Sequence, residues 1–349
     1  MPSTHVEWCG AGRQGSGGGT DRLAICKANR QRNNPSLGFS PKSAKKQSKT
    51  SEFQALGPIH PRISCQQVRA IITLMETPEN QPRPASSAIQ QRNRQAYDRM
   101  VQTRHFLTQP VSAQELASPL ATLDAKGWLG GNIRGWNVLC LAAGGGRQGP
   151  LYCAAGARVT VLDISPAMLE LDRQVSSHLG MNYQIIQGEM SELSMFRPDE
   201  FDLVAHPVST CYVSNVEAVF AEVTRVLRPG GLYVSQHKQP MNLQASLEMN
   251  QGRYVVETPV GSPAKSLAIG QTSLLREPDT VEFAHSLDAI LGGICRAGMI
   301  IEAVSEPDHA NLDSEPGTMG HRSRFIRPYL RVKARKKSDA SSERRIWLG

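Results

Sequence analysis

The sequence predicts an α/β fold: a seven-stranded, mostly parallel sheet with helices on both faces and an antiparallel last strand. Two observations lead to this fold class. Short apolar runs alternate with segments of helical spacing from Trp136 onward, and this alternation requires a parallel sheet that is covered on both faces. The last run, Phe325–Val332, follows the run Met299–Val304 after only a loop, so it must be antiparallel to its predecessor.

The strands are expected where apolar runs are bounded by turn residues. They are Asn137–Ala142, Arg158–Asp163, Asn182–Gln187, Phe201–His206, Leu232–Gln236, Met299–Val304 and Phe325–Val332. Helices are expected between them at Gln148–Ala155, from Ser165 to about Leu179, at Val216–Leu227 and at Phe283–Ala297. Ser165 is a suitable N-cap with Pro166 at the first helical position, and Arg228-Pro-Gly-Gly231 should stop the third helix.

Two helices are expected ahead of the sheet, within residues 85–135. The segment Ser87–Thr103 has apolar residues at near-helical spacing, and Ser112 is a suitable N-cap for a shorter helix at Gln114–Ala117. After the fifth strand, residues 239–282 are rich in Gln, Asn, Pro and Gly and break the alternation. This stretch is predicted to be an insertion that forms a β-hairpin or a cap.

The net charge of +8 belongs to the ends of the chain. Residues 1–84 carry 12 basic and 5 acidic side chains, and residues 331–349 carry 7 and 2, so the intervening chain is acidic. The first 70 residues lack apolar periodicity and cannot bury enough apolar surface to offset the entropy of ordering. We therefore expect a disordered basic extension over 1–84 (or a true start at Met75), a folded domain over 85–334 and a basic disordered tail over 335–349.

The seven cysteines are scattered and form no CxxC pair. This pattern argues against a disulfide framework and against a zinc site, and it predicts a reducing, cytoplasmic location with no bound metal. No apolar run approaches the roughly 20 residues of a membrane helix, and the N-terminus lacks a signal-peptide core.

The expected site begins where the first strand runs into a glycine cluster. Gly144-Gly-Gly146-Arg-Gln-Gly149 matches GxGxxG, and Asp163 ends the second strand 19 residues after Gly144. Glycines let the backbone approach a ligand closely, and an acid at this position can accept hydrogen bonds from two ribose hydroxyls. The unit suits a dinucleotide or S-adenosylmethionine, unless its glycines serve only a tight turn.

Three further motifs follow the glycine unit in order. With them, residues from about Trp136 to Val332 resemble the class I S-adenosylmethionine-dependent methyltransferases, in particular small-molecule enzymes of the methyltransferase type 11 kind, which have a Rossmann-like fold. Nicotinamide dehydrogenases do not usually carry this ordered set. The motifs are Gln187-Gly-Glu-Met190, Phe201–His206 and Arg225-Val-Leu-Arg-Pro-Gly-Gly-Leu-Tyr-Val234, and the stretch 285–307 looks like the last helix and sixth strand of such enzymes.

The resemblance implies S-adenosyl-L-methionine as the cofactor and assigns residues to it. Asp163 would bind the ribose hydroxyls and Ile164 would pack on the adenine, which Glu189 and Met190 would also contact. The other implied cofactor residues are Ala142, Gly144, Gly145, Gly146 and His206. The first strand departs from the family pattern, because Cys140 stands where many members have an acid and Ala142 replaces the first glycine.

The methyl acceptor is expected to be a small molecule held by the N-terminal helices and the insertion. Tyr97 lies on a helix that covers the cofactor in many relatives, and Ser209, Tyr212 and His237 follow strands at the edge where ligands bind. A general base is needed only if the acceptor must lose a proton. His206 is the first candidate, ahead of His237, His285 and His321, although histidines in such positions more often serve the fold alone.

Two other functions fit parts of the sequence. A non-catalytic module could bind RNA or protein through the basic tails, although basic tails are more often solvated than specific. A nicotinamide dehydrogenase would share the glycine unit. We expect nucleic acid to bind only through the tails, if at all, and no membrane to be a partner.

Overall fold

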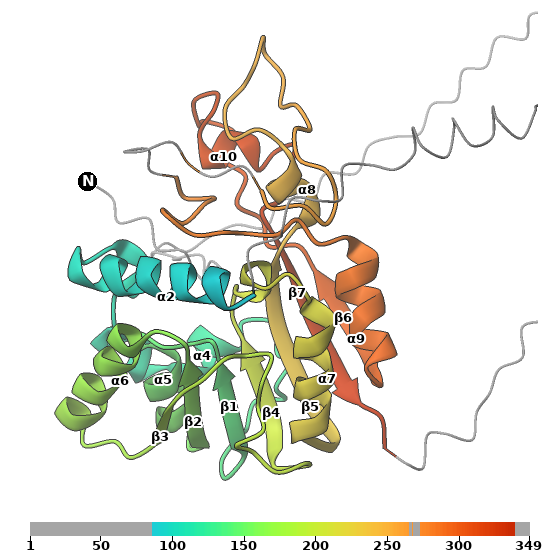
Figure 1. The fold of residues 1–349 in the computed structure, drawn as a ribbon. Coiled ribbons are helices and arrows are strands. Elements are labelled where there is room, and N and C mark those ends of the chain that lie inside the picture. Colours follow the sequence, from blue (N-terminus) through green and yellow to red (C-terminus); the bar gives the residue numbers. More distant parts are fainter. Residues whose placement is uncertain (1–85, 265–266, 268–272, 339–349) are drawn as a thin grey trace, which may run out of the picture. The chain divides into compact units, whose positions relative to one another are not determined.

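The computed structural model describes residues 86–264, 267 and 273–338 (Figure 1). In chain order the elements are α2 (Ser86–Gln102), η1 (Phe106–Thr108), α3 (Ala113–Ala117), α4 (Pro119–Leu123), β1 (Asn137–Leu141), α5 (Gln148–Ala154), β2 (Arg158–Asp163), α6 (Pro166–Leu179), β3 (Gln184–Gln187), β4 (Phe201–His206), η2 (Thr210–Tyr212), α7 (Val216–Val226), β5 (Leu227–Lys238), α8 (Pro240–Gln244), η3 (Asp288–Gly292), α9 (Gly293–Arg296), β6 (Met299–Ser305), α10 (Met319–Arg322) and β7 (Tyr329–Lys336). The predicted basic extension and all but the start of the tail lie outside the described residues.

The strands form one seven-stranded sheet in the order β3-β2-β1-β4-β5-β7-β6. Neighbours from β3 to β5 pair in parallel, and β7 pairs antiparallel with both β5 and β6. This confirms the predicted fold class, including the antiparallel last strand. Because the order reverses beside β1 and β4, a crevice opens at the carboxyl ends of these strands, where open α/β sheets bind ligands.

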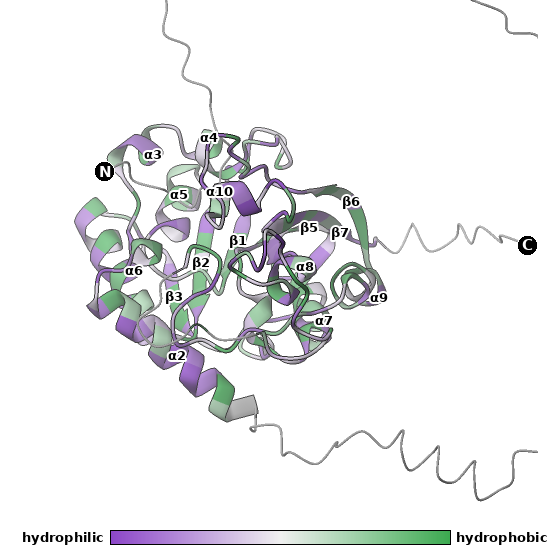
Figure 2. Ribbon diagram, turned by 90° about the horizontal axis from the view of Figure 1, so that it is seen from above, coloured by the Kyte–Doolittle hydropathy of each residue, from purple (hydrophilic) through white to green (hydrophobic). Residues whose placement is uncertain are grey.

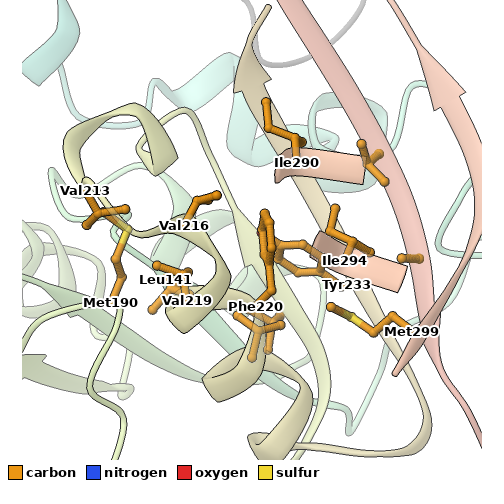
Figure 3. Packing of buried hydrophobic residues seen from close by; sticks show 14 of the residues in the cluster. Leu141, Met190, Val213, Val216, Val219, Phe220, Tyr233, Ile290, Ile294 and Met299 are labelled. Carbon is orange, nitrogen blue, oxygen red and sulfur yellow. The ribbon is translucent and has the colours of Figure 1, made fainter. Parts of the chain in front are cut away.

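Both faces of the sheet are buried. Along β1, successive side chains point alternately into one core cluster and the other. Val138 and Cys140 belong to a core cluster with α4, α5 and α6, whereas Leu139 and Leu141 belong to a cluster with α7 and α9 on the other face. In the second cluster, the rings of Phe220 and Tyr233 lie 6.1 Å apart beside Ile290, Ile294 and Met299 (Figure 3). A near-continuous apolar run is what a doubly covered parallel strand requires.

Helix α2 lies across the edge of the sheet at which the site forms. It contacts α6 and η2, which follow the carboxyl ends of β2 and β4, and it is hydrophilic over much of its length (Figure 2). Polar bonds hold it: the Asp98 carboxylate accepts hydrogen bonds from the Ser165 hydroxyl (2.6 Å) and the Ala167 amide (3.2 Å) at the start of α6. The predicted N-caps Ser165 and Ser112 are both confirmed.

Three elements start four or more residues away from their predicted positions. Strand β7 begins at Tyr329 rather than Phe325, because the α10 turn continues through hydrogen bonds from Phe325 and Ile326 to Arg322. The helix expected from Phe283 begins only near Asp288, because the Phe283 amide donates to Cys211. Arg228-Pro-Gly-Gly231 does stop α7, but it lies within β5, at an irregularity in the pairing with β4.

The turn after β1 is held from inside by Asp172 of α6. One carboxylate oxygen of this fully buried residue accepts hydrogen bonds from the amides of Gly145 (2.8 Å) and Gly146 (3.0 Å), and the other accepts from the Tyr183 hydroxyl (3.2 Å). Gly146 also has no room for a side chain, because a Cβ there would lie 2.8 Å from the methyl group of Val175. The loop is therefore fixed to α6 by its own backbone.

Ala142, in the same turn, adopts a left-handed backbone with φ of 50°. This conformation costs a residue with a Cβ about 1–2 kcal/mol, whereas glycine adopts it freely. We predict that Ala142→Gly raises the free energy of unfolding by roughly 0.5–1 kcal/mol, because the relief of strain exceeds the entropy that glycine adds to the unfolded chain, about 0.4–1 kcal/mol. Urea denaturation would measure the change.

The neighbouring Ala143 gives the control. It is buried and is not among the left-handed residues, so Ala143→Gly should destabilise the protein. If Ala142→Gly were destabilising by the same amount, strain at this position would be excluded.

Asp172 should make stability depend on pH. Burial raises its pKa to about 6, against the hydrogen bonds from Gly146, Gly145 and Tyr183 that lower it. A carboxyl whose folded pKa exceeds its unfolded value, near 3.8, contributes stability that is fully present below the unfolded pKa and is lost as pH rises through the folded one. Between pH 4 and 7 the wild type should therefore lose on the order of 2–3 kcal/mol relative to Asp172→Asn.

Thermal or urea unfolding of both proteins across this range tests the assignment. Parallel pH curves for wild type and Asp172→Asn would show that Asp172 does not titrate in the folded state.

Candidate functional site

A cavity lies at the carboxyl ends of β1, β2 and β4, beneath α2, with about 550 Å³ of empty space that is partly open to solvent. Its lining comes from α2, from the turn after β1, from β2 and α6, and from the loops after β3 and β4. The lining residues are Gln90, Asn93, Tyr97, Ala142, Asp163, Ile164, Met168, Glu189, Met190, Val208, Ser209, Tyr212 and Val213.

Asp163 is the most firmly placed polar group of the cavity. Its carboxylate accepts hydrogen bonds from the amides of Gly144 (2.9 Å) and Ser165 (2.9 Å), so it is held by the glycine turn on one side and the start of α6 on the other. Burial raises the pKa of Asp163, and the hydrogen bonds from these amides oppose the rise. Its two oxygens offer roughly four acceptor positions, so the carboxylate can still accept hydrogen bonds from a ligand.

Glu189 provides a second carboxylate, on the loop after β3. The Ser191 hydroxyl lies 3.5 Å from its carboxylate, and burial raises the pKa of Glu189 against hydrogen bonds from Ser191 and the Met190 backbone, which lower it. Ile164 and Met190 also line the cavity and supply apolar surface next to the two acids. With Ala142, the structure thus brings together five of the residues that the sequence predicted for the cofactor.

The three glycines lie in the turn beside the cavity. Ala142 lines the cavity, whereas the amides of Gly144, Gly145 and Gly146 donate to Asp163 and Asp172. Contact between these glycines and a cofactor stays a prediction. In the structure the glycines shape the turn that positions Asp163 and Ala142.

Two tyrosines predicted to bind the acceptor close the cavity on the side of α2. The hydroxyls of Tyr97 and Tyr212 lie 2.8 Å apart, and the two rings meet edge to face with centroids 5.7 Å apart. Burial raises the pKa of both hydroxyls well above the usual value, so both stay protonated. Asn93 supports them from α2, since its amide donates to the carbonyl of Tyr212 and also bonds both backbone groups of Val281.

Ser209 lines the cavity, and His206 lies behind it. The His206 Nε2 atom is 2.6 Å from the Ser209 hydroxyl, and Nδ1 is 2.8 Å from the Tyr233 hydroxyl. The imidazole is fully buried, and burial lowers its pKa to about 3. His206 therefore reaches the cavity only through Ser209, and its role as a base stays a prediction.

The other predicted histidines lie apart from the cavity. His237 is fully buried between the hydroxyls of Thr210 and Ser235, each at 2.8 Å, and burial lowers its pKa to about 3. His285 bonds the carbonyls of Thr210 and Val213, and His321 lies against the Tyr254 hydroxyl. Each of these rings has a structural partner, and contact between His237 and an acceptor stays a prediction.

Sequence patterns missed several residues of the site. Gln90, Asn93, Met168, Val208 and Val213 also line the cavity. Asn93 lies four positions before Tyr97 on α2, so one helical turn of spacing could have placed both on the same face. Asp98 and Asp172 gave no local signal, because Ser165 and the glycine amides that they bind lie at least 26 residues away in the sequence.

Within the described ranges, no group of three or more His, Cys, Asp or Glu side chains could hold a metal ion. The same part of the chain contains no helix that is long and apolar enough to cross a membrane. Its four cysteines, Cys140, Cys153, Cys211 and Cys295, are all unpaired.

Comparison with known proteins gives consistent results. The model of a methyltransferase domain family matches residues 139–235. The uncharacterized methyltransferase YbaJ of Bacillus subtilis is 33% identical over 234 residues, which cover 63% of this chain and 91% of YbaJ. A demethylmenaquinone methyltransferase of Tropheryma whipplei is 30% identical over 128 residues, or 36% of this chain and 52% of that protein.

Among solved structures, an S-adenosylmethionine-dependent methyltransferase from Mesorhizobium loti is similar over 63% of this chain and 100% of its own. It shares 22% sequence identity and has a TM-score of 0.47.

The family assignment depends on YbaJ, because that match spans nearly the whole length of the relative. The methyltransferase domain model agrees, since it covers the chain from β1 to β5, which includes Asp163 and Glu189. The chain therefore belongs to the methyltransferase family that this domain model describes.

Proposed function

We propose that the cavity beneath α2 binds S-adenosyl-L-methionine and that the enzyme transfers the methyl group to a small molecule. The observation that carries this proposal is the placement of Asp163. Its carboxylate is held at the cavity by two amides, in the position of an acid that accepts hydrogen bonds from ribose hydroxyls. Glu189, Ile164 and Met190 lie beside it, where an adenine would follow.

The charge of the cavity lining favours S-adenosylmethionine over a dinucleotide as the ligand. The lining contains two carboxylates and neither lysine nor arginine, which suits hydroxyl donors and the positive charges of S-adenosylmethionine. A pyrophosphate would need the loop amides at the start of the helix. In this enzyme the amides of Gly145 and Gly146 are already bonded to a buried carboxylate, so they cannot serve an anion.

The residues of the chain then act mainly by alignment. The bound cofactor supplies a methyl group that its sulfonium already activates. Asp163 and Glu189 fix the orientation of the ligand, while Tyr97, Tyr212, Val208 and Val213 exclude water on the opposite side. Alignment of this kind supplies much of the acceleration in a displacement between two bound reactants.

The partners and the location of the enzyme stay predictions. We propose a small-molecule acceptor that enters between α2, η2 and the insertion 239–282, and no membrane partner. The unpaired cysteines of the described chain support a reducing, cytoplasmic location.

Asp163→Asn should weaken the binding of S-adenosylmethionine roughly 10- to 100-fold, because an amide cannot accept hydrogen bonds on both sides as the carboxylate does. Isothermal titration calorimetry on the full chain measures the affinity. Glu170→Gln is the matched control, since Glu170 is an exposed carboxylate of α6 that pairs with Arg173. It should bind as the wild type does.

Asp163 also holds the glycine turn, so its substitution could weaken binding by disturbing the fold. A second variant separates this effect from the loss of a ligand contact. Glu189→Gln leaves the turn intact and should weaken binding in the same direction. Unchanged affinity in both variants would rule out this cavity as the cofactor site. Stabilisation against heat by NAD but not by S-adenosylmethionine would favour a nicotinamide site.

A further inference from the structure

A buried cluster of charges lies behind the two tyrosines. Lys238, at the end of β5, is 2% exposed, and its ammonium group lies 2.8 Å from a carboxylate oxygen of Glu282 and also contacts Glu277. It donates a third hydrogen bond to the carbonyl of Leu275. Both acids belong to the insertion between β5 and β6, so the cluster joins this segment to the sheet.

The cluster holds two carboxylates for one ammonium group. Burial acts to raise the pKa of Glu277, but Lys238 and hydrogen bonds from Glu282 and Tyr212 lower it to about 2. Burial raises the pKa of Glu282 to about 7, in spite of the nearby Lys238. The guanidinium of Arg276 is buried close by, but it donates to the carbonyls of Asn242, Leu243 and Leu275.

A chain of hydroxyl groups connects the cluster with the cavity. The Tyr212 hydroxyl lies 2.8 Å from that of Tyr97, and on its other side it lies near the carboxylate of Glu277, whose pKa it lowers. Both tyrosines line the cavity. A proton released in the cavity can therefore pass through two hydroxyls to a pair of carboxylates.

The histidine network next to it cannot hold such a proton. Ser209 leads to His206 and then to Tyr233, all of them uncharged. A group with a pKa of about 3 does not stay protonated near neutral pH. Of the two networks that reach the cavity, the one through Tyr97 and Tyr212 ends in carboxylates.

We infer that Tyr97, Tyr212 and the Glu277–Glu282 pair form a proton-transfer chain that deprotonates the methyl acceptor, which therefore carries an O–H or N–H group at the atom methylated. This inference depends on the proposed methyl transfer in the same cavity. Lys238 positions the two carboxylates.

Methyl transfer in this cavity moves one methyl group and one proton. The bond from the methyl group to sulfur breaks, the bond from the methyl group to the acceptor atom forms, and the acceptor loses its proton to the Tyr97 hydroxyl. Tyr97 passes its own proton to Tyr212, Tyr212 passes its own to Glu277, and Glu277 passes a proton on to Glu282, which has the higher pKa of the two acids. The carboxylate pair ends with one more proton, which returns through the same hydroxyls to water after the product leaves.

The pH dependence follows from the groups that face the pair. The carboxylates accept a proton only while both are ionised, so the rate should rise with pH through about 7 and then level off. Burial moves the pKa of the neighbouring tyrosines and of Cys211 further above neutral and that of His105 below its usual value. The groups around the pair are Lys238, Arg276, Cys211, Tyr97, Tyr212, Tyr329 and His105.

The test uses the full chain, methyl-labelled S-adenosylmethionine and a host-cell metabolite extract as the acceptor source. Glu282→Gln should lower the rate of labelling roughly 10- to 100-fold and abolish its rise near pH 7. Tyr212→Phe keeps the ring and should lower the rate similarly, while calorimetry finds the affinity for S-adenosylmethionine within about twofold of the wild type. Glu248→Gln, an exposed acid of the same insertion, should change neither.

A spectroscopic measurement does not depend on turnover. Infrared difference spectra of the wild type should show a protonated-carboxyl band that titrates near pH 7 and is missing in Glu282→Gln. Wild-type rate and pH profile in Tyr212→Phe would overturn the inference, as would loss of thermal stability in Glu282→Gln without a change in pH profile. Failure of the wild type to bind S-adenosylmethionine would instead overturn the proposed function.

Discussion

The hydrogen bonds from Gly145 and Gly146 to Asp172 are the constraint on which the site depends. They fix the turn after β1 to the middle of α6, although the three glycines of the turn have no side chains with which to pack. Once the turn is fixed, the Gly144 amide meets Asp163, and Ala142 faces the cavity. A buried carboxylate is costly to ionise, but two amides at 2.8 and 3.0 Å offset much of this cost.

The opposite side of the cavity is held by different chemistry. There Lys238 links the insertion to the sheet through Glu277 and Glu282, and Asn93 links α2 to the same segment. A buried ion pair is weak evidence for stability, since desolvation cancels much of the attraction. An excess carboxylate beside a lysine makes better sense as a group that exchanges a proton than as a stabilising contact.

The sequence predicted the sheet and the cofactor side of the cavity well, because both are encoded locally. Buried strands appear in the sequence as apolar runs. Ser165 with Pro166 marks the start of α6, and Asp163 is the last residue of β2. The remainder depends on pairs that meet only after folding. Lys238 and Glu282 lie 44 residues apart, and charged residues of this kind are expected on the surface. The start of β7 was misplaced for a similar reason, since nothing in the pattern showed that Phe325 belongs to a turn of α10 and is 65% exposed.

The fastening of α2 has a consequence for ligand exchange. This helix contributes Gln90, Asn93 and Tyr97 to the lining of the cavity, so lifting the helix would widen the way out for a ligand held beneath it. At its rim, Arg92 and Arg99 hold it to Asp279 by exposed polar contacts of 3.0 and 3.2 Å, which salt weakens. The sheet below is held by apolar burial, which salt does not screen. Rates of cofactor release at two ionic strengths would therefore report on the opening of this roof, separately from the stability of the fold.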